Sequence, residues 1–258
     1  MSPLEENLSH SPGILDEIEK AGRERLHPAL TDPNWLVLRK RRDIFSRWLH
    51  DLKLRDPRVL DVGGRIQPYR SLIEGRKTAK KKINGDDIGP TNSSRYIALD
   101  FVATPLVNVI ANAHNLPFLS ASFDLVCCTQ MVEYANDPQR VIDEIHRVLK
   151  PGGFLLLSVP SVYPQDSVND RWRFLPGALT ILLAGFSKIE IAPEGSSVVG
   201  FVRTVNVCLL RSAAAIRLAP LVQYSLVPLL NLFGLGLEAM IATGDNSFAA
   251  NFSVLAEK

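Results

Sequence analysis

Polar residues stand at the ends of four predicted strands, the places where parallel sheets bind their ligands. Each follows a short apolar run that is typical of a buried strand. In open parallel sheets, ligands bind beyond the carboxyl ends of the strands, at the point where the strand order reverses. The four strand ends therefore predict one shared ligand site. Its residues are Asp61 to Gly64, Asp100, Asn112, and Thr129 with Gln130.

The residue types at these strand ends suit a ligand that carries a ribose and a base. Gly63 and Gly64 allow a sharp turn and a close approach of the backbone to a ligand, because glycine has no Cβ. Asp100 can accept hydrogen bonds from both ribose hydroxyls, as an acid does at this place in dinucleotide-binding folds. Asn112 can contact the edge of an adenine. Each feature alone is also common in sheets without a ligand, so the prediction depends on their combination.

Strand and helix patterns alternate along the chain from about residue 58. Such alternation predicts a mostly parallel sheet with helices on both faces. We expect an α/β, Rossmann-like fold with a mostly parallel seven-stranded sheet, an extra N-terminal helix and an apolar helical insertion before the last strand. The expected strands cover 58–62, 96–99, 107–110, 123–129, 154–159, 187–191 and 251–256. The expected helices cover 14–25, 35–54, 66–74, 136–150, 175–184 and two segments within 202–241, and residues 76–94 are expected to form a surface loop.

Two local patterns refine this expectation. The strongest helix pattern, at 136–150, begins at a polar cap, Asn136 or Asp137, and ends before a Pro-Gly-Gly sequence. Only five residues separate Asp100 from Leu106. A crossover between parallel strands usually takes a dozen or more residues. We therefore expect no helix between the second and third strands, and a third strand that is short or irregular.

The composition excludes some classes of protein. The formal net charge is only +2, which argues against a dedicated nucleic-acid binder. Three cysteines cannot form a disulfide framework, so we expect a reduced, cytoplasmic compartment. No spacing of His and Cys suits a metal, and the polar N-terminus does not resemble a signal peptide. We expect residues 1–33 to form a mobile arm and residues 34–258 to form one domain.

A stretch in the middle of the chain resembles a known family. The segments LPF, SFDLV, DP and EIHRVLKPGG follow one another within residues 116–153, and the likeness extends over about 58–192. This stretch resembles the class I methyltransferases of the type 11 group, which implies methyl transfer with S-adenosylmethionine as the cofactor. The resemblance places Asp61, Gly63 and Gly64 on the methionine and ribose side of the cofactor, Asp100 on the ribose hydroxyls, Phe101 and Asn112-Ala113 around the adenine, and Thr129 and Gln130 beside the sulfonium.

The chain departs from the pattern of this family at several positions. Arg65 and Gln67 stand where the glycine loop of the family usually continues with glycines. Asn112 replaces a common Asp, which keeps an acceptor but removes the charge. Glu133-Tyr134 stands where many relatives have Glu-His.

The segment PSVYPQDSVNDRWRF (160–174) resembles a loop in relatives that act on glycans or lipid-linked sugars, with Asp166 at or near the position of a His. An oxygen nucleophile would need a general base. The candidates are Asp166, Tyr134 and Glu133, in that order. Two roles stay open for the end of the segment. Trp172 and Arg173 either contact the substrate or are structural, with Arg173 paired to Asp170.

Residues 218–237 carry no charge over a length just sufficient to span a bilayer, but they contain two prolines and several polar residues. We expect 200–241 to form a helical cap over the substrate pocket. The alternative is peripheral contact of 202–241 with the inner membrane surface, with a lipid-linked or otherwise apolar substrate.

The sequence thus predicts an S-adenosylmethionine-dependent methyltransferase that acts on a small-molecule, sugar or lipid-linked acceptor, at oxygen. A degenerate S-adenosylmethionine-binding module without catalytic activity is the alternative, since Arg65 and Gln67 replace glycines and the habitual His residues are absent. A dinucleotide-dependent oxidoreductase is disfavoured, because Gly63-Gly64 lacks the G-x-G-x-x-G spacing.

Overall fold

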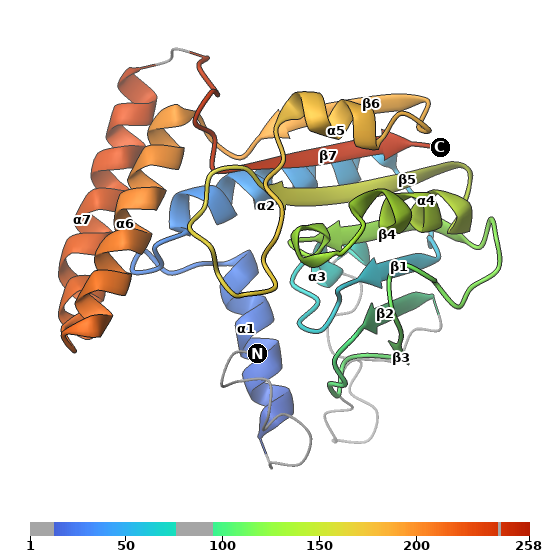
Figure 1. Ribbon diagram of the computed structural model, residues 1–258, viewed down its shortest axis with the longest axis horizontal. Helices are drawn as coiled ribbons and strands as arrows, with labels where there is room; N and C mark the ends of the chain where they lie inside the picture. The colour runs from blue at the N-terminus through green and yellow to red at the C-terminus, as the bar shows by residue number, and fades with distance from the viewer. Residues whose placement is uncertain (1–12, 76–94, 242–243) are drawn as a thin grey trace.

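The computed structural model describes residues 13–75, 95–241 and 244–258. Seven strands form one sheet in the order β3-β2-β1-β4-β5-β7-β6 (Figure 1). Strands β1 to β5 run parallel, whereas β7 is antiparallel to both β5 and β6. The predicted α/β, Rossmann-like architecture is confirmed. The strands are β1 Val59–Val62, β2 Tyr96–Asp100, β3 Val109–Ile110, β4 Phe123–Thr129, β5 Leu149–Pro160, β6 Lys188–Pro193 and β7 Asn251–Glu257.

Helices cover both faces of the sheet because successive strand residues point to opposite sides. Leu155 and Leu157 of β5 belong to the core that α4 and α5 cover. Leu156, between them, packs on the other side in a cluster with Phe45 and Trp48 of α2. The helices are α1 Ile14–Leu26, α2 Trp35–Leu52, α3 Arg70–Ile73, α4 Pro138–Val148, α5 Pro176–Leu182, α6 Ser197–Ala215 and α7 Ala219–Met240, and a short 3₁₀ helix, η2, spans Val132–Tyr134.

Several local predictions agree with the structure. Asp137 caps α4, and its carboxylate accepts a hydrogen bond from the backbone N–H of Arg140 at 3.1 Å. No helix lies between β2 and β3, and β3 has two residues, as the short connection predicts.

The predicted helix at 66–74 is wrong for its first half, since α3 covers only Arg70–Ile73. Gln67 adopts a left-handed backbone conformation with φ of 43°, which an α-helix does not allow. Its side-chain amide is buried and donates to the carbonyl oxygen of Leu106 at 2.6 Å, which holds the segment against the connection between β2 and β3. The surface loop expected at 76–94 lies outside the described residues.

Helix α1 packs against the domain, in contrast to the mobile arm expected for residues 1–33. Ile18 and Leu26 are buried, and Leu26 joins the cluster under α2. A Cβ on Gly22 would lie 2.4 Å from the carbonyl oxygen of Ile66, so the two backbones touch there. Residues 14–26 therefore belong to the packed part of the molecule. Residues 1–12 lie outside the described part of the chain.

Helices α6 and α7 stand side by side at one end of the molecule (Figure 1). They pack on α2 through a small cluster in which Leu36 and Val37 meet Val199 and Val202. Both helices are long and apolar enough to cross a membrane, judged by length and composition alone. Much of α7 is solvent-exposed, since only 17% of its most apolar window is buried.

Candidate active site

A cavity of about 190 Å³ lies at the carboxyl ends of β1 and β4. Gly63 lines it from the turn after β1, and Thr129 and Gln130 line it from the end of β4. Helix α2, helix α6 and the loop after β5 supply other walls. The structure thus brings three of the predicted cofactor residues to one cavity. The other predicted cofactor residues lie outside its lining; they are Asp61, Gly64, Asp100, Phe101, Asn112 and Ala113.

The turn after β1 is built for glycine. Gly63 has a φ of +82°, and a Cβ on it would lie 2.9 Å from the side chain of Met131. A Cβ on Gly64 would lie 2.8 Å from the carboxyl carbon of Asp61. The N–H groups of both glycines donate to the carbonyl oxygen of Leu99. The turn therefore presents bare backbone to the cavity, as close binding of a ligand requires.

Asp61 supports this turn from beneath. Its side chain is buried and accepts a 2.6 Å hydrogen bond from the hydroxyl of Tyr96. Burial raises the pKa of the Asp61 carboxyl to about 6 despite that hydrogen bond, and the negative charge of Asp100 adds to the rise. Asp61 is therefore a buried carboxylate that lies against Gly64 and does not line the cavity.

The remaining predicted cofactor residues follow β2 and β3 on an open surface. Asp100 ends β2, and one of its carboxylate oxygens accepts the backbone N–H of Val102 at 2.9 Å. Phe101, beside it, is 79% exposed, which leaves its ring free to stack on a base. Asn112 uses its side-chain oxygen to accept the backbone N–H of His114 at 3.0 Å. Ala113 packs against the core.

The end of β4 turns sharply at Gln130, whose φ is +51°. Its backbone N–H donates to the carbonyl oxygen of Ser158, and its side-chain amide donates to the hydroxyl of the same residue at 3.1 Å. These bonds to β5 fix the direction in which the chain leaves the sheet. They place Glu133 and Tyr134 of η2 on the wall of the cavity.

Glu133 is the most unusual group of this wall. Its side chain is only 3% exposed, and one carboxylate oxygen, Oε2, has no hydrogen-bond partner. Burial raises the pKa of Glu133 to about 8. Its carbonyl oxygen accepts the backbone N–H groups of Arg171 and Trp172, which ties η2 to the loop after β5. The sequence predicts Glu133 only as the third of three base candidates, because burial is not visible in the sequence.

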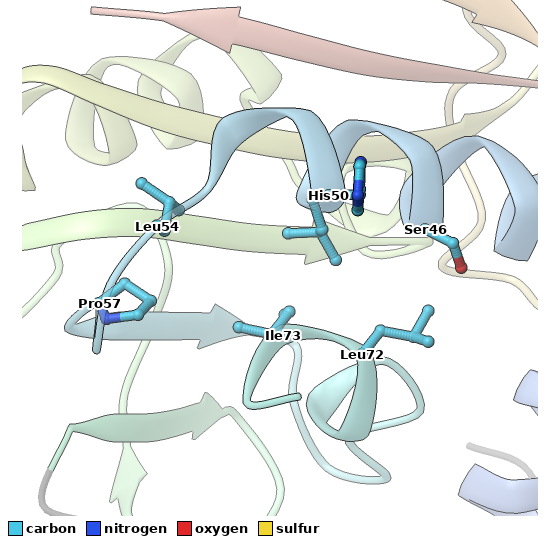
Figure 2. Close-up of a pocket in the computed structure, with 7 residues that line it drawn as sticks. Ser46, His50, Leu54, Pro57, Leu72 and Ile73 are labelled. Atoms are coloured by element: carbon cyan, nitrogen blue, oxygen red, sulfur yellow. The ribbon is translucent and has the colours of Figure 1, made fainter. Parts of the chain in front are cut away.

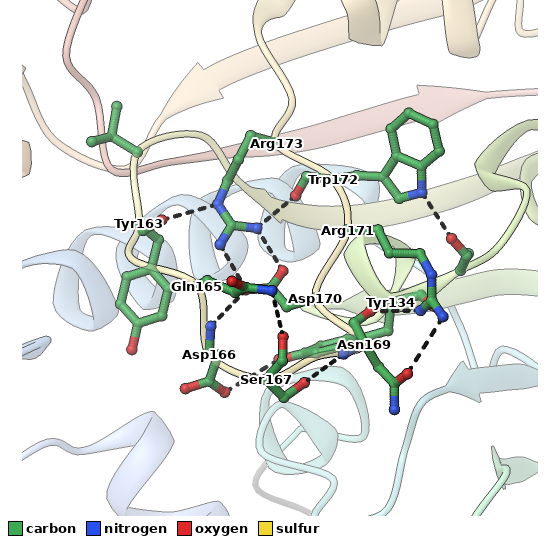
Figure 3. A network of polar contacts seen from close by, with 12 residues as sticks. Tyr134, Tyr163, Gln165, Asp166, Ser167, Asn169, Asp170, Arg171, Trp172 and Arg173 are labelled. Atoms are coloured by element: carbon green, nitrogen blue, oxygen red, sulfur yellow. Dashed lines mark hydrogen bonds and ion pairs between the residues drawn. The ribbon is translucent and has the colours of Figure 1, made fainter. Parts of the chain in front are cut away.

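The first two candidates, Asp166 and Tyr134, meet at the edge of the same cavity (Figure 3). The hydroxyl of Tyr134 donates to Asp166 at 3.4 Å. Asp166 also pairs with Arg211 of α6 at 3.2 Å, and its side chain is 52% exposed. Burial and the negative charge of Glu133 raise the pKa of Tyr134, so its hydroxyl keeps its proton. Asp166 is thus a solvated, ion-paired carboxylate, and Glu133 is a desolvated one.

The loop after β5 is braced by Asp170 and Arg173 (Figure 3). Arg173 donates from both terminal nitrogens to the two carboxylate oxygens of Asp170, each at 2.6 Å. The indole N–H of Trp172 donates to the carbonyl oxygen of Ala135 at 2.8 Å, and Phe174 is buried. The Arg173–Asp170 pair of the structural alternative is present, but the Trp172 ring is 41% exposed and is not a core anchor.

Sequence reasoning missed a buried ion pair behind the cavity. Arg41 of α2 donates to both oxygens of Glu194, at 2.9 Å each. The Glu194 carboxylate also accepts bonds from Ser158, Asn251 and Ser253. Burial alone would raise the pKa of Glu194, but the charge and hydrogen bond of Arg41 together with the bonds from Ser158 and Asn251 lower it. In the sequence Arg41 stands within a basic run that looks like a solvated face.

Another cavity, of about 210 Å³, lies between α2 and α3 (Figure 2). Its lining is mostly apolar, with Leu54, Leu72 and Ile73 facing Ser46 and His50. His50 is largely exposed and pairs with the adjacent Asp51. None of the strand-end residues lines it, so the chemistry belongs to the cavity at β1 and β4.

A family model described as a methyltransferase domain matches residues 75–157. This match covers β2 to β5, the strands whose ends carry most of the predicted cofactor residues. Over this stretch the chain is similar to S-adenosylmethionine-dependent methyltransferases.

Three relatives illustrate the range of proteins to which the chain is similar. The arginine-hydroxylase NDUFAF5 of Mus musculus is 43% identical over 140 residues, which cover 54% of this chain and 38% of the relative. The chloroplastic 2-methyl-6-phytyl-1,4-hydroquinone methyltransferase 1 of Oryza sativa is 31% identical over 147 residues, 54% of this chain and 43% of the relative. The ubiquinone/menaquinone biosynthesis C-methyltransferase UbiE of Bartonella tribocorum is 30% identical over 133 residues, 49% of this chain and 51% of the relative. The chain spans about half the length of these relatives or less.

The strand-end residues fit the cofactor of the family. Gly63 lines the cavity without a side chain, and Asp100 has a carboxylate oxygen without a partner among the described residues. The chain also accommodates its departures from the glycine pattern. Gln67 takes the left-handed conformation that glycine favours, and its side chain adds a hydrogen bond.

We expect Asp100→Ala to weaken binding of S-adenosylmethionine by about 1–3 kcal/mol, because the ribose hydroxyls lose charge-assisted hydrogen bonds. Isothermal titration calorimetry measures this loss. Asp143→Ala, at an exposed aspartate of α4, is the control and should bind like the wild type. Unchanged affinity of the Asp100 variant would remove this residue from the cofactor site.

Proposed function

We propose that this methyltransferase transfers a methyl group from S-adenosylmethionine to a hydroxyl oxygen of a small-molecule, sugar or lipid-linked acceptor. The observation that supports this most strongly is the position of Glu133. A buried carboxylate with an unpartnered oxygen lines the same cavity as Gly63, Thr129 and Gln130. A base beside the place of methyl transfer is what an alcohol or phenol acceptor needs, since the neutral hydroxyl is a poor nucleophile.

The cofactor, when bound, supplies a methyl group that its sulfonium already activates. The residues of the chain have three tasks. Gly63, Thr129 and Gln130 fix the direction in which the methyl group points into the cavity. This alignment with the acceptor contributes to the rate of methyl transfer. Glu133 accepts the proton of the acceptor hydroxyl on its free Oε2. The loop after β5, held to η2 by the bonds to the Glu133 carbonyl, limits access of water to this place.

Glu133 suits the role of base better than Asp166. A pKa of about 8 matches the proton affinity of the group to a neutral working pH, which favours proton transfer in general base catalysis. Asp166 is paired with Arg211 and accepts a bond from Tyr134. We therefore assign Asp166 and Tyr134 to the mouth of the cavity, where the pair positions the acceptor.

Two relatives are named for methylation of hydroquinone or quinone compounds, the phytyl-hydroquinone enzyme and the ubiquinone and menaquinone enzyme. Such acceptors join a hydroxylated ring to a long apolar tail. They support an acceptor with an apolar part here, while the oxygen as methylated atom is our own proposal. Transfer of label from methyl-labelled S-adenosylmethionine to a lipid extract tests it, and product analysis separates an O-methyl from a C-methyl group. Bound cofactor without labelled product from either lipid or aqueous extract would contradict the proposal.

We further propose that α7 lies on the cytoplasmic surface of a membrane. Helix α6 borders the cavity through Arg203, whereas no residue of α7 lines it, which favours membrane contact over a cap for α7. Residues 218–237 carry no charge, and large apolar side chains of α7 are exposed to solvent. They are Leu221, Tyr224, Leu226, Leu229, Leu232, Phe233, Leu235 and Met240.

The charges around the two helices favour a flat position over a spanning one. Arg217 lies in the turn between α6 and α7, and Arg211 lies near it. Insertion of the pair with its turn leading would bury both arginines in the bilayer, at a cost of about 2.5–3.5 kcal/mol each. A helix lying in the interface keeps them at the level of the lipid headgroups. Strand β7, which follows α7, stays paired with β5 and β6.

We expect the double variant Leu229→Ser/Phe233→Ser to bind vesicles about tenfold more weakly or worse. The variant lacks two large apolar side chains that move from water into the membrane when the wild type binds. Each contributes roughly 1.5–3 kcal/mol to binding when fully buried. Co-sedimentation with vesicles of phosphatidylcholine and phosphatidylglycerol measures the effect. Leu119→Ser/Val168→Ser removes two exposed apolar side chains elsewhere and serves as the control. Equal binding of the two double variants would contradict the assignment to α7.

A further inference from the structure

Helix α6 carries a buried arginine that no carboxylate neutralises. Arg203 is 4% exposed and lines the cavity at β1 and β4. Its Nε donates to the side-chain oxygen of Asn34 at 2.8 Å, and Nη1 donates to the carbonyl oxygen of Val162 at 2.9 Å. The guanidinium carbon lies 3.8 Å from the centre of the Tyr163 ring. Among the described residues, no Asp or Glu forms an ion pair with it, and its Nη2 has no acceptor.

The second buried arginine of the cavity, Arg41, has the counter-charge that Arg203 lacks. Arg41, also on the wall, has both oxygens of Glu194 as partners. A buried charge that lacks a counter-charge is costly, and protein interiors rarely tolerate it without a function. Burial lowers the pKa of Arg203 to about 10, which still leaves the guanidinium protonated at neutral pH. Arg203 therefore keeps a positive charge that faces the cavity.

Other charges of the lining do not cancel this one. The carboxylates of Asp166 and Asp170 are each paired with an arginine outside the lining, Arg211 and Arg173. Glu133 holds its proton up to a pH of about 8. Two exposed arginines, Arg25 and Arg65, also line the cavity and form no ion pair with the described residues. The cavity thus has an excess of positive charge.

The position of Arg203 separates it from the turn that holds the cofactor. Its contacts, Asn34, Val162 and Tyr163, belong to the segment before α2 and to the loop after β5. Arg65, in contrast, directly follows the Gly63-Gly64 turn. Of the arginines that line the cavity, Arg65 is therefore the one adjacent in sequence to the turn that we assign to the cofactor. The charge on α6 is therefore left for the second substrate.

We propose that Arg203 binds an oxyanion, a phosphate or carboxylate group, carried by the acceptor. This inference rests on the proposed function, because it assigns this wall of the cavity to the acceptor of methyl transfer. Nη2 supplies the free donor, and the Asn34 and Val162 bonds together with the Tyr163 ring hold the guanidinium plane fixed. A preordered, desolvated arginine is the group that proteins use for planar oxyanions.

The test uses inorganic phosphate as probe and the full chain saturated with S-adenosylhomocysteine. Calorimetry measures phosphate binding to the wild type, to Arg203→Met and to Arg47→Met, an exposed arginine of α2 that serves as the control. We expect Arg203→Met to bind phosphate about tenfold more weakly or worse, because a charge-assisted hydrogen bond is lost. Arg47→Met should bind it like the wild type. Affinity for S-adenosylhomocysteine should stay within about twofold in all three proteins.

A second arm distinguishes a lipid headgroup from a soluble anion. Vesicles of phosphatidylcholine are compared with vesicles that also contain phosphatidic acid. If phosphatidic acid increases vesicle binding of Arg47→Met but no longer increases that of Arg203→Met, the bound anion is a lipid phosphate. A loss confined to inorganic phosphate indicates a soluble acceptor, and both results support the proposal.

Two results would overturn it. If Arg203→Met binds phosphate as tightly as the wild type does, and its vesicle binding depends on phosphatidic acid to the same extent, Arg203 is not an anion site. If phosphate competes with S-adenosylhomocysteine, and Arg203→Met binds both ligands more weakly, Arg203 would be assigned to the carboxylate of the cofactor. Absence of S-adenosylhomocysteine binding in the wild type would instead contradict the proposed function, so the two failures are distinct.

Discussion

Replacing Glu133 by glutamine lowers the rate of methyl transfer by about 10²- to 10⁴-fold, the usual contribution of a general base. Glutamine keeps the size of the side chain but cannot accept a proton from the acceptor. Affinity for S-adenosylhomocysteine stays unchanged, because Glu133 faces the acceptor in our mechanism. The label-transfer assay measures the rate, and Asp166→Asn gives the comparison. If Asp166→Asn lost as much activity as Glu133→Gln, or more, Glu133 would not be the base.

The same residue makes activity depend on pH. The base must be deprotonated, and burial raises the pKa of Glu133 to about 8. The rate of the wild type therefore rises with pH and levels off above about pH 8, whereas the residual rate of Glu133→Gln lacks this step. A profile that levels off near pH 4.5, the ordinary pKa of a glutamate, would contradict the burial of this carboxyl.

Stability provides a readout that needs no acceptor. The folded state holds a proton on Glu133 between the unfolded pKa of 4.5 and the folded pKa of about 8. In this window the folded state binds more protons than the unfolded state, so the free energy of unfolding falls as pH rises. Glutamine resembles the protonated carboxyl at every pH. Thermal unfolding should show Glu133→Gln gaining stability over the wild type between about pH 5 and pH 8, and a constant difference would count against this account.

Glu194→Gln destabilises the fold by about 3–5 kcal/mol, the usual effect of removing one partner of a buried ion pair. The variant leaves the guanidinium of Arg41 buried against a neutral amide. It also replaces a carboxylate that accepts bonds from Ser158, Asn251 and Ser253. For a chain of this size the melting temperature should fall by roughly 10 °C. Thermal and denaturant unfolding near neutral pH measure the loss.

Glu257→Gln is the matched control for this variant. Glu257 pairs with Lys188 at 2.7 Å, but the lysine is 78% exposed. An exposed pair contributes about 0–1 kcal/mol. A loss in Glu194→Gln as small as in Glu257→Gln would show that the Arg41 pair does not hold α2 to the sheet.

The fold was predictable from the sequence because its elements are marked by local patterns. The apolar run 154–159 and the capped, periodic helix at 136–150 both depend on neighbours in sequence. The 66–74 helix was mispredicted, because tertiary contacts decide the left-handed backbone of Gln67. Helix α1 was expected in a mobile arm, since a single Gly22 gives no sign that it packs on the carbonyl of Ile66.

The site was predictable only where the chain itself marks it. The Gly63 turn and the end of β4 at Gln130 follow strands directly, so their meeting at one cavity could be expected. Glu133, Arg203 and the Arg41–Glu194 pair acquire their chemistry from burial, which depends on packing between segments far apart in the chain. In the sequence these residues are ordinary charged residues.

The central claim is that the strand ends at β1, β2 and β4 bind S-adenosylmethionine. Calorimetric titration of the wild-type chain with S-adenosylhomocysteine tests it most directly, because it needs neither acceptor nor turnover. We predict saturable binding at a single site. Absence of saturable binding, or tighter binding of a nicotinamide dinucleotide, would contradict the claim.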